Sequence, residues 1–149
     1  MNRWLTLASA LLAILLATTP AFGQQAEEFG DFTVHYNTLN TSQLTPTVAQ
    51  AYGIQRSSSR ALLNITVLRK SEGKLPQAVE AQVVANARNL TGQRKDIEMR
   101  KITEASEAIY YIGEFRVNNM ETFDFTVAVT PTGESRPLEL KFRQQFYTE

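Results

Sequence analysis

Apolar and polar side chains alternate along most of the chain after its first two dozen residues, and this period constrains the fold more than any other feature. Alternation at every second residue places successive side chains on opposite faces of a β-strand. It predicts seven strands, around residues 32–36, 60–69, 79–87, 95–101, 108–117, 123–129 and 138–142. Two of them, 60–69 and 108–117, carry apolar side chains on both faces, so we expect them at the centre of a sheet.

One segment departs from the alternation and predicts a short helix. Residues 45–53 read TPTVAQAYG, with a threonine N-cap, a proline at the first helical position and a glycine after the last turn. We expect two turns of helix between the first and second predicted strands. Val48 and Tyr52 are four residues apart, so both are expected on the side that faces the sheet.

Seven short antiparallel strands predict an all-β fold, a seven-stranded immunoglobulin-like β-sandwich with one short helix between strands 1 and 2. A small β-barrel is the alternative. The cysteine and tryptophan pattern of true immunoglobulin domains is absent, because the chain has no cysteine and its one tryptophan is Trp4. The prediction therefore concerns architecture. The charged segment 95–101 is expected at a sheet edge, where charges discourage pairing between molecules.

The first 23 residues have the three parts of a secretory signal peptide. Arg3 precedes the uncharged run LTLASALLAILLA over residues 5–17, and the small residues Ala21 and Gly23 lie three and one before Gln24. Thirteen helical residues span roughly 20 Å, against about 30 Å of bilayer hydrocarbon, so a membrane anchor is the weaker alternative. We expect cleavage after Gly23, a single domain over residues 24–149, a periplasmic location, and contact with the membrane only during export.

Composition excludes several classes of function. With 15 basic and 15 acidic side chains, the chain has no positive excess for holding nucleic acid. No cysteine and one histidine leave no thiolate or multi-histidine metal site and no cysteine nucleophile. Neither a phosphate-binding loop nor a dinucleotide-binding glycine motif is present. We therefore expect no cofactor and no bound metal.

Catalysis has little support in the sequence. His35, the only histidine, falls on the outward-facing set of the first predicted strand, where a solvated residue is the usual finding. Carboxylate pairs occur at Asp96 and Glu98, Glu104 and Glu107, and Glu121 and Asp124. Because these carboxylates alternate with basic residues or occupy turns, a carboxylate-dependent hydrolase assisted by His35 is an unfavoured alternative. We expect a protein that is not an enzyme.

The remaining candidates are binding residues. Arg56 and Arg60 flank three serines, a combination that could hold an anion and is more often a surface loop. Tyr110 and Tyr111 are neighbours on one strand, so one ring faces the core and the other the outer surface, where it could meet a partner. Together with Tyr52 and His35, residues Arg56, Arg60 and Tyr110 form the predicted binding set.

The chain resembles a known family over residues 27–147. The resemblance lies in FGDFTVHYNTLNTSQLTPTVAQAYGIQRSSSRALLNITVL at residues 29–68, and in NLTGQ, AIYYIGEF and the closing LKFRQQFY. These motifs are similar to sequences in the small exported proteins of Gram-negative bacteria that are grouped as domain of unknown function 4426. The resemblance implies a periplasmic location and a sandwich fold, and it brings no catalytic residue.

These observations favour a non-enzymatic binding or adaptor module of the cell envelope, whose partner is an envelope protein or a small ligand. An assembly factor or chaperone that offers an edge strand to its clients is the first alternative, because it needs only a sandwich with a free edge. The hydrolase is the second alternative.

Overall fold

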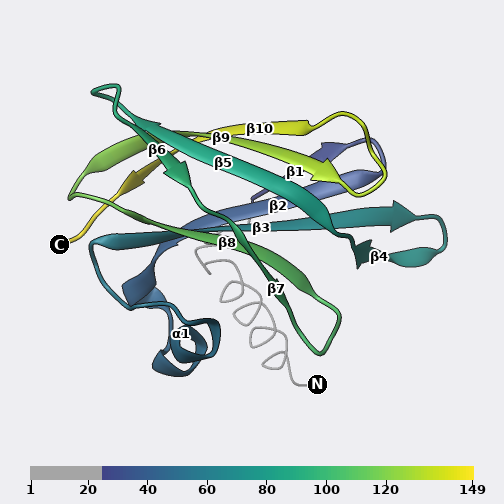
Figure 1. Ribbon diagram of the computed structural model, residues 1–149, viewed down its shortest axis with the longest axis horizontal. Coiled ribbons are helices and arrows are strands. Elements are labelled where there is room, and N and C mark those ends of the chain that lie inside the picture. Colours follow the sequence, from purple (N-terminus) through teal and green to yellow (C-terminus); the bar gives the residue numbers. More distant parts are fainter. Residues whose placement is uncertain (1–24) are drawn as a thin grey trace, which may run out of the picture.

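The protein is described here by a computed structural model that covers residues 25–149, and its strands form two antiparallel sheets packed face to face (Figure 1). The larger sheet contains β1 (Gln25–Phe29), β2 (Phe32–Asn40), β3 (Arg60–Ser71), β4 (Lys74–Ala78), β7 (Arg100–Thr103) and β8 (Ile109–Arg116). The smaller sheet contains β5 (Ala81–Asn89), β6 (Arg94–Ile97), β9 (Glu121–Pro131) and β10 (Leu138–Phe146). The two sheets remain separate, so the sandwich prediction is confirmed and the barrel alternative is wrong.

Strand order supports the prediction of central strands and corrects the number of strands. The larger sheet runs β1-β2-β3-β8-β7 with β4 also paired to β3, and the smaller runs β10-β9-β5-β6. Strands β3 and β8, which correspond to 60–69 and 108–117, are indeed internal. The described chain has ten strands, not seven. Strands β1 and β4 were not predicted, because QAEEF and KLPQA lack apolar alternation.

The predicted 95–101 strand is two strands that belong to different sheets. Strand β6 forms one edge of the smaller sheet and β7 one edge of the larger, so the chain crosses between sheets at Glu98 and Met99. This crossing lies against Gly113 of β8. A Cβ atom at Gly113 would be 2.5 Å from Ile97 Cγ2 and 2.9 Å from the Glu98 carbonyl oxygen. Only glycine allows so close an approach of two backbones.

The core lies between the two sheets and is almost wholly apolar. Strand β3 contributes Leu63, Ile65 and Val67, each at most 1% exposed. Four phenylalanines, Phe115, Phe123, Phe125 and Phe146, pack mostly edge to face, with ring centroids 5.5–6.2 Å apart. Among the described residues, this core is built from phenylalanine, tyrosine and aliphatic side chains.

The predicted helix is present as α1 (Pro46–Tyr52), preceded by a short 3-10 turn, η1 (Thr41–Gln43). Thr45 Oγ1 accepts a hydrogen bond from Val48 N, and Gly53 ends the helix with φ of 66°. The helix lies on the outer face of the larger sheet (Figure 1), and its buried residue is Ala49, whereas Val48 is 37% exposed. Tyr52 packs toward the sheet as expected, and Val48 reaches it only at the helix margin.

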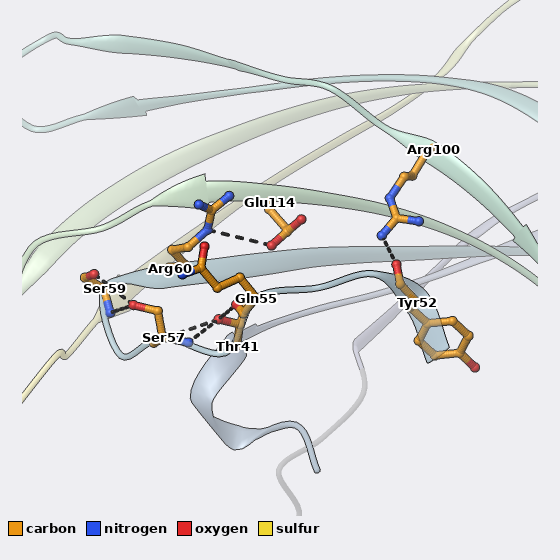
Figure 2. Close-up of polar contacts among 8 residues, drawn as sticks. All are labelled: Thr41, Tyr52, Gln55, Ser57, Ser59, Arg60, Arg100 and Glu114. Carbon is orange, nitrogen blue, oxygen red and sulfur yellow. Dashed lines mark hydrogen bonds and ion pairs between the residues drawn. The ribbon is translucent and has the colours of Figure 1, made fainter. Parts of the chain in front are cut away.

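Polar contacts join η1 to the loop after α1, and the end of α1 to β7 of the larger sheet (Figure 2). The fully buried Thr41 donates from Oγ1 to the Gln55 carbonyl oxygen at 2.8 Å and accepts from Ser57 N at 2.9 Å. Arg100 of β7 donates to the Tyr52 carbonyl oxygen, one of the last in the helix. A cation at this end also favours the helix dipole.

The predicted signal peptide, residues 1–23, lies outside the described residues, and its cleavage stays a prediction. Within residues 25–149, no helix has the length and apolar character needed to cross a membrane.

Candidate functional site

A cavity of about 180 Å³ lies between α1 and the outer face of the larger sheet. We call it the α1 pocket. Its lining is mainly aliphatic, with two tyrosines, one asparagine and one glutamate. The lining residues are Leu39, Leu44, Val48, Tyr52, Ile54, Leu62, Asn64, Ile102, Glu104, Tyr110 and Ile112.

Strand pairing builds the floor of the α1 pocket. In the register of the larger sheet, Leu39 of β2 is opposite Leu62 of β3, and Ile102 of β7 is opposite Tyr110 of β8. Side chains at alternate positions share a face, so these residues form rows on the outer side of the sheet. A second apolar cluster, distinct from the core, forms here around the buried Ala49, Ile54, Leu62 and Ile112.

One polar group in the floor has no partner. Asn64 of β3 lies between Asn37 of β2 and Ile112 of β8. Its Oδ1 atom is buried and makes no hydrogen bond within the described chain. An unpaired buried amide oxygen costs about 1–3 kcal/mol, and most native structures pair such atoms. The floor of the α1 pocket therefore contains a buried hydrogen-bond acceptor without a partner.

The rim of the α1 pocket carries a tyrosine and a carboxylate that are bonded to each other. Tyr52 donates its hydroxyl proton to Glu104 Oε1. This hydrogen bond, followed by burial, raises the pKa of Tyr52 above its ordinary value of 10.0. The bond joins the end of α1 to the segment between β7 and β8, so it closes one side of the pocket.

The structure brings together two of the five predicted binding residues. Tyr52 and Tyr110 both line the α1 pocket. His35 of β2 lies on the same outer face of the larger sheet as the α1 pocket, but it does not line the pocket. It is half-buried, with Ala26 of β1 on one side and Thr66 of β3 on the other.

The two predicted arginines contact the protein itself. Arg56 donates from Nε to the Leu44 carbonyl oxygen at 2.8 Å and from Nη2 to that of Ser42 at 3.1 Å. Arg60 Nε lies 3.7 Å from Glu114 Oε1 (Figure 2). Both guanidinium groups thus hold the segment around η1 and the start of β3, and this geometry gives no support to an anion site between them.

The carboxylate pairs do not converge. Asp96 pairs with Arg94 at 2.9 Å, and Asp124 pairs with Arg143 at 2.7 Å on the outside of the smaller sheet. Across residues 25–149, no group of three or more histidines and carboxylates is placed to hold a metal ion.

Several residues of the α1 pocket were missed by the sequence reasoning, chiefly Leu44, Ile54, Asn64 and Ile102. A signal was present for part of the floor. Leu62 and Ile112 are apolar residues on the second face of their strands, and such residues need a cover. Nothing local marked Ile54 or Ile102, which depend on the path of α1 and on the β7–β8 pairing.

By its fold and candidate site, the protein is a two-sheet β-sandwich with an apolar pocket beneath a short helix on one outer face. Residues 26–149 match the family described as domain of unknown function DUF4426, so the chain belongs to that family. This match confirms the resemblance seen in the sequence.

A solved structure agrees with this assignment. The crystal structure of a DUF4426 family protein from Pseudomonas aeruginosa PAO1 is 35% identical to this chain, with a TM-score of 0.73. The similarity covers 85% of this chain and 97% of that one. No curated protein matches the chain.

Proposed function

We propose that the protein is a non-enzymatic binding module of the cell envelope, exported to the periplasm by a cleaved signal peptide, and that its ligand places a small apolar group in the α1 pocket. The observation that carries the proposal is the combination of an open aliphatic cavity with one unpaired acceptor, Asn64 Oδ1, in its floor. Binding sites commonly combine apolar walls with a few polar groups that fix orientation.

The size and chemistry of the α1 pocket define the ligand class. A dry cavity of about 150 Å³ accepts a benzene-sized molecule, so about 180 Å³ suits one branched aliphatic or aromatic group. The ligand should also carry an N–H or O–H donor beside that group, because such a donor would satisfy Asn64. A leucine-like side chain next to an amide, on an envelope protein or a small molecule, has both features.

The direct test is a titration followed by NMR. N-acetyl-leucinamide supplies the branched apolar group and the donor, and acetamide is the control without the apolar group. We expect the leucine probe to shift the amide signals of residues that line the α1 pocket, including Tyr52 and Tyr110. Acetamide should shift none of them.

Two variants make this test specific. Asn64→Leu removes the acceptor and fills the floor, so the shifts should disappear. Asn86→Leu makes the same change in the middle of β5 in the smaller sheet, and it should bind the probe as the unchanged protein does. Shifts that persist in Asn64→Leu, or that are absent from the unchanged protein, would contradict the assignment of this pocket.

The export part of the proposal has its own test. The first residue of protein recovered from the periplasmic fraction should be Gln24. Recovery of protein that still begins at Met1 or Asn2 would overturn it.

A further inference from the structure

A second and larger hollow, of about 860 Å³, lies between the end of β2 and the C-terminal half of β10. We call it the β2–β10 groove. Its walls combine residues distant in sequence, including Asn40, Gln43, Gln144, Gln145 and Tyr147. It shares Leu39 and Leu44 with the α1 pocket and includes Phe142 and Phe146, but most of its other lining residues carry amide or hydroxyl groups.

Charge is almost absent from the β2–β10 groove. Among its lining residues, Glu149 alone has a charged side chain, although a fifth of the whole sequence is charged. Asparagine and glutamine side chains each offer a carbonyl acceptor and an amide donor, and hydroxyls do both. A surface of this kind fits a neutral ligand with many hydrogen-bonding groups better than an ion or a nucleic acid.

Some amide groups in the groove hold its walls, and others are left over. Asn40 Nδ2 donates to the Ser58 and Tyr147 carbonyl oxygens at 3.0 and 2.6 Å. Gln43 Oε1 accepts from Asn40 N at 3.1 Å, and Gln144 Nε2 donates to the Gln145 carbonyl oxygen at 2.9 Å. Within the described chain, this leaves the Gln43 amide nitrogen and the Gln144 amide oxygen without a partner.

An exposed aromatic ring is fixed beside these groups. Tyr147 is 57% exposed, yet its hydroxyl donates to Gln145 Oε1 at 2.8 Å and its carbonyl oxygen accepts from Asn40. Gln145 is itself held by a bond from Nε2 to the Met120 carbonyl oxygen at 3.0 Å. The ring is therefore held in place before any ligand arrives, which lowers the entropy lost on binding.

From these contacts we propose that the β2–β10 groove binds a neutral saccharide. The C–H face of a sugar ring carries slight positive charge and suits the negative face of the Tyr147 ring. Sugar hydroxyls can accept from Gln43 and donate to Gln144 at the same site. This proposal is independent of the α1 pocket and of its ligand.

An extended peptide is the competing occupant, and the edge of β2 offers it little. The register pairs Tyr36 with Gln25 of β1, and Asn40 N is bonded to Gln43. Main-chain groups on one edge of a strand belong to alternate residues, so Thr38 is the residue between these two that faces the groove. One residue is too short a template for strand addition, which depends on a series of main-chain hydrogen bonds.

The test uses protein that is expressed from the full sequence, beginning at Met1, and purified with whatever N-terminus the cell leaves on it. Isothermal titration with chitotetraose and with maltotetraose compares acetamido-bearing and purely hydroxylic neutral oligosaccharides. Tyr147→Ala should lower the affinity at least about tenfold. Tyr147→Phe keeps the ring and its carbonyl contact with Asn40 but loses the hydroxyl bond to Gln145, so its affinity should fall by about threefold at most. Leu90→Ala, at an exposed turn of the smaller sheet, is the control and should bind normally.

Each outcome decides the proposal. Binding of either oligosaccharide that is lost in Tyr147→Ala supports it, and the preferred probe identifies the kind of sugar. No binding of either at millimolar concentration overturns it. If a neutral extended peptide binds at the groove and neither saccharide binds, the proposal is also overturned and the groove is assigned to peptides.

Discussion

The two faces of β3 and β8 meet different surroundings, although they belong to the same strands. Inward, Leu63 and Ile65 of β3 are 0% exposed and pack in the phenylalanine-rich core between the sheets. Outward, Leu62 of β3 and Ile112 of β8 belong to the small cluster beneath α1, which leaves a cavity of about 180 Å³. The inner face is filled, whereas the outer face is covered but not filled.

This difference bears on both the stability of the fold and the proposed binding. Core packing at crystal-like density stabilises the fold and leaves no space for a ligand. The α1 pocket has space, a buried acceptor without a partner, and a helix of only two turns as its cover. Under the proposed function, the inner face stabilises the sandwich and the outer face binds the ligand.

The largest predicted effect comes from neighbouring leucines on opposite faces of β3. Leu63→Ala should lower the free energy of unfolding by about 4 kcal/mol, because it opens a void in a closed core. Leu62→Ala should cost about 2.5 kcal/mol, because its neighbours already border a hollow and the added cavity is less confined. Urea denaturation measures both. Equal losses would show that the two faces contribute equally to stability and would contradict the difference between a filled inner face and an unfilled outer face.

A second effect tests how closely the sheet crossing packs on the inner face. Gly113→Ala should cost about 1–3 kcal/mol, because its Cβ would meet Ile97 and the Glu98 carbonyl oxygen. Ile97→Ala removes the nearest of these atoms. The double variant should therefore lose less than the sum of the two single losses, as a double-mutant cycle would show. An additive result would mean that Gly113 and Ile97 do not compete for this space.

The smallest effect concerns the rim of the α1 pocket and depends on pH. The neutral Tyr52 hydroxyl is favoured by its bond to Glu104, so its pKa is raised above 10.0 in the folded protein. Its stabilising contribution is present below pH 10.0 and is lost as the pH rises through the raised pKa. The stability advantage over Tyr52→Phe should therefore be constant from neutral pH to about pH 9 and shrink in more alkaline solution. An advantage that grows with pH would contradict the assigned donor.

Local sequence patterns predicted the parts of the fold that local chemistry determines. Pro46 and Gly53 marked the ends of α1, and alternation marked the central strands. Strand β1 was missed because Glu27 and Glu28 hide its pattern at a sheet edge. The change of sheet between β6 and β7 could not be predicted, because it depends on the contact of Glu98 with Gly113, a residue distant in sequence.

The same limit applies to the two candidate sites. Tyr52 and Tyr110 were identified as single residues, and apolar positions on the outer face of β3 and β8 hinted at a cover. Asn64 could not be identified from the sequence, since its unpaired oxygen appears only once β2, β3 and β8 are paired. The β2–β10 groove had no signal, because Asn40 and Tyr147 meet through the fold alone.

The most direct test of the account is the free energy of unfolding of Asn64→Leu, compared with Asn86→Leu. If the floor of the α1 pocket keeps an acceptor for a ligand, removing it should stabilise the protein by about 1 kcal/mol, because a buried unpaired oxygen is lost. Asn86→Leu should give no such gain. A loss of stability in Asn64→Leu would show that the asparagine serves the fold, and would contradict the division between a stabilising inner face and a binding outer face.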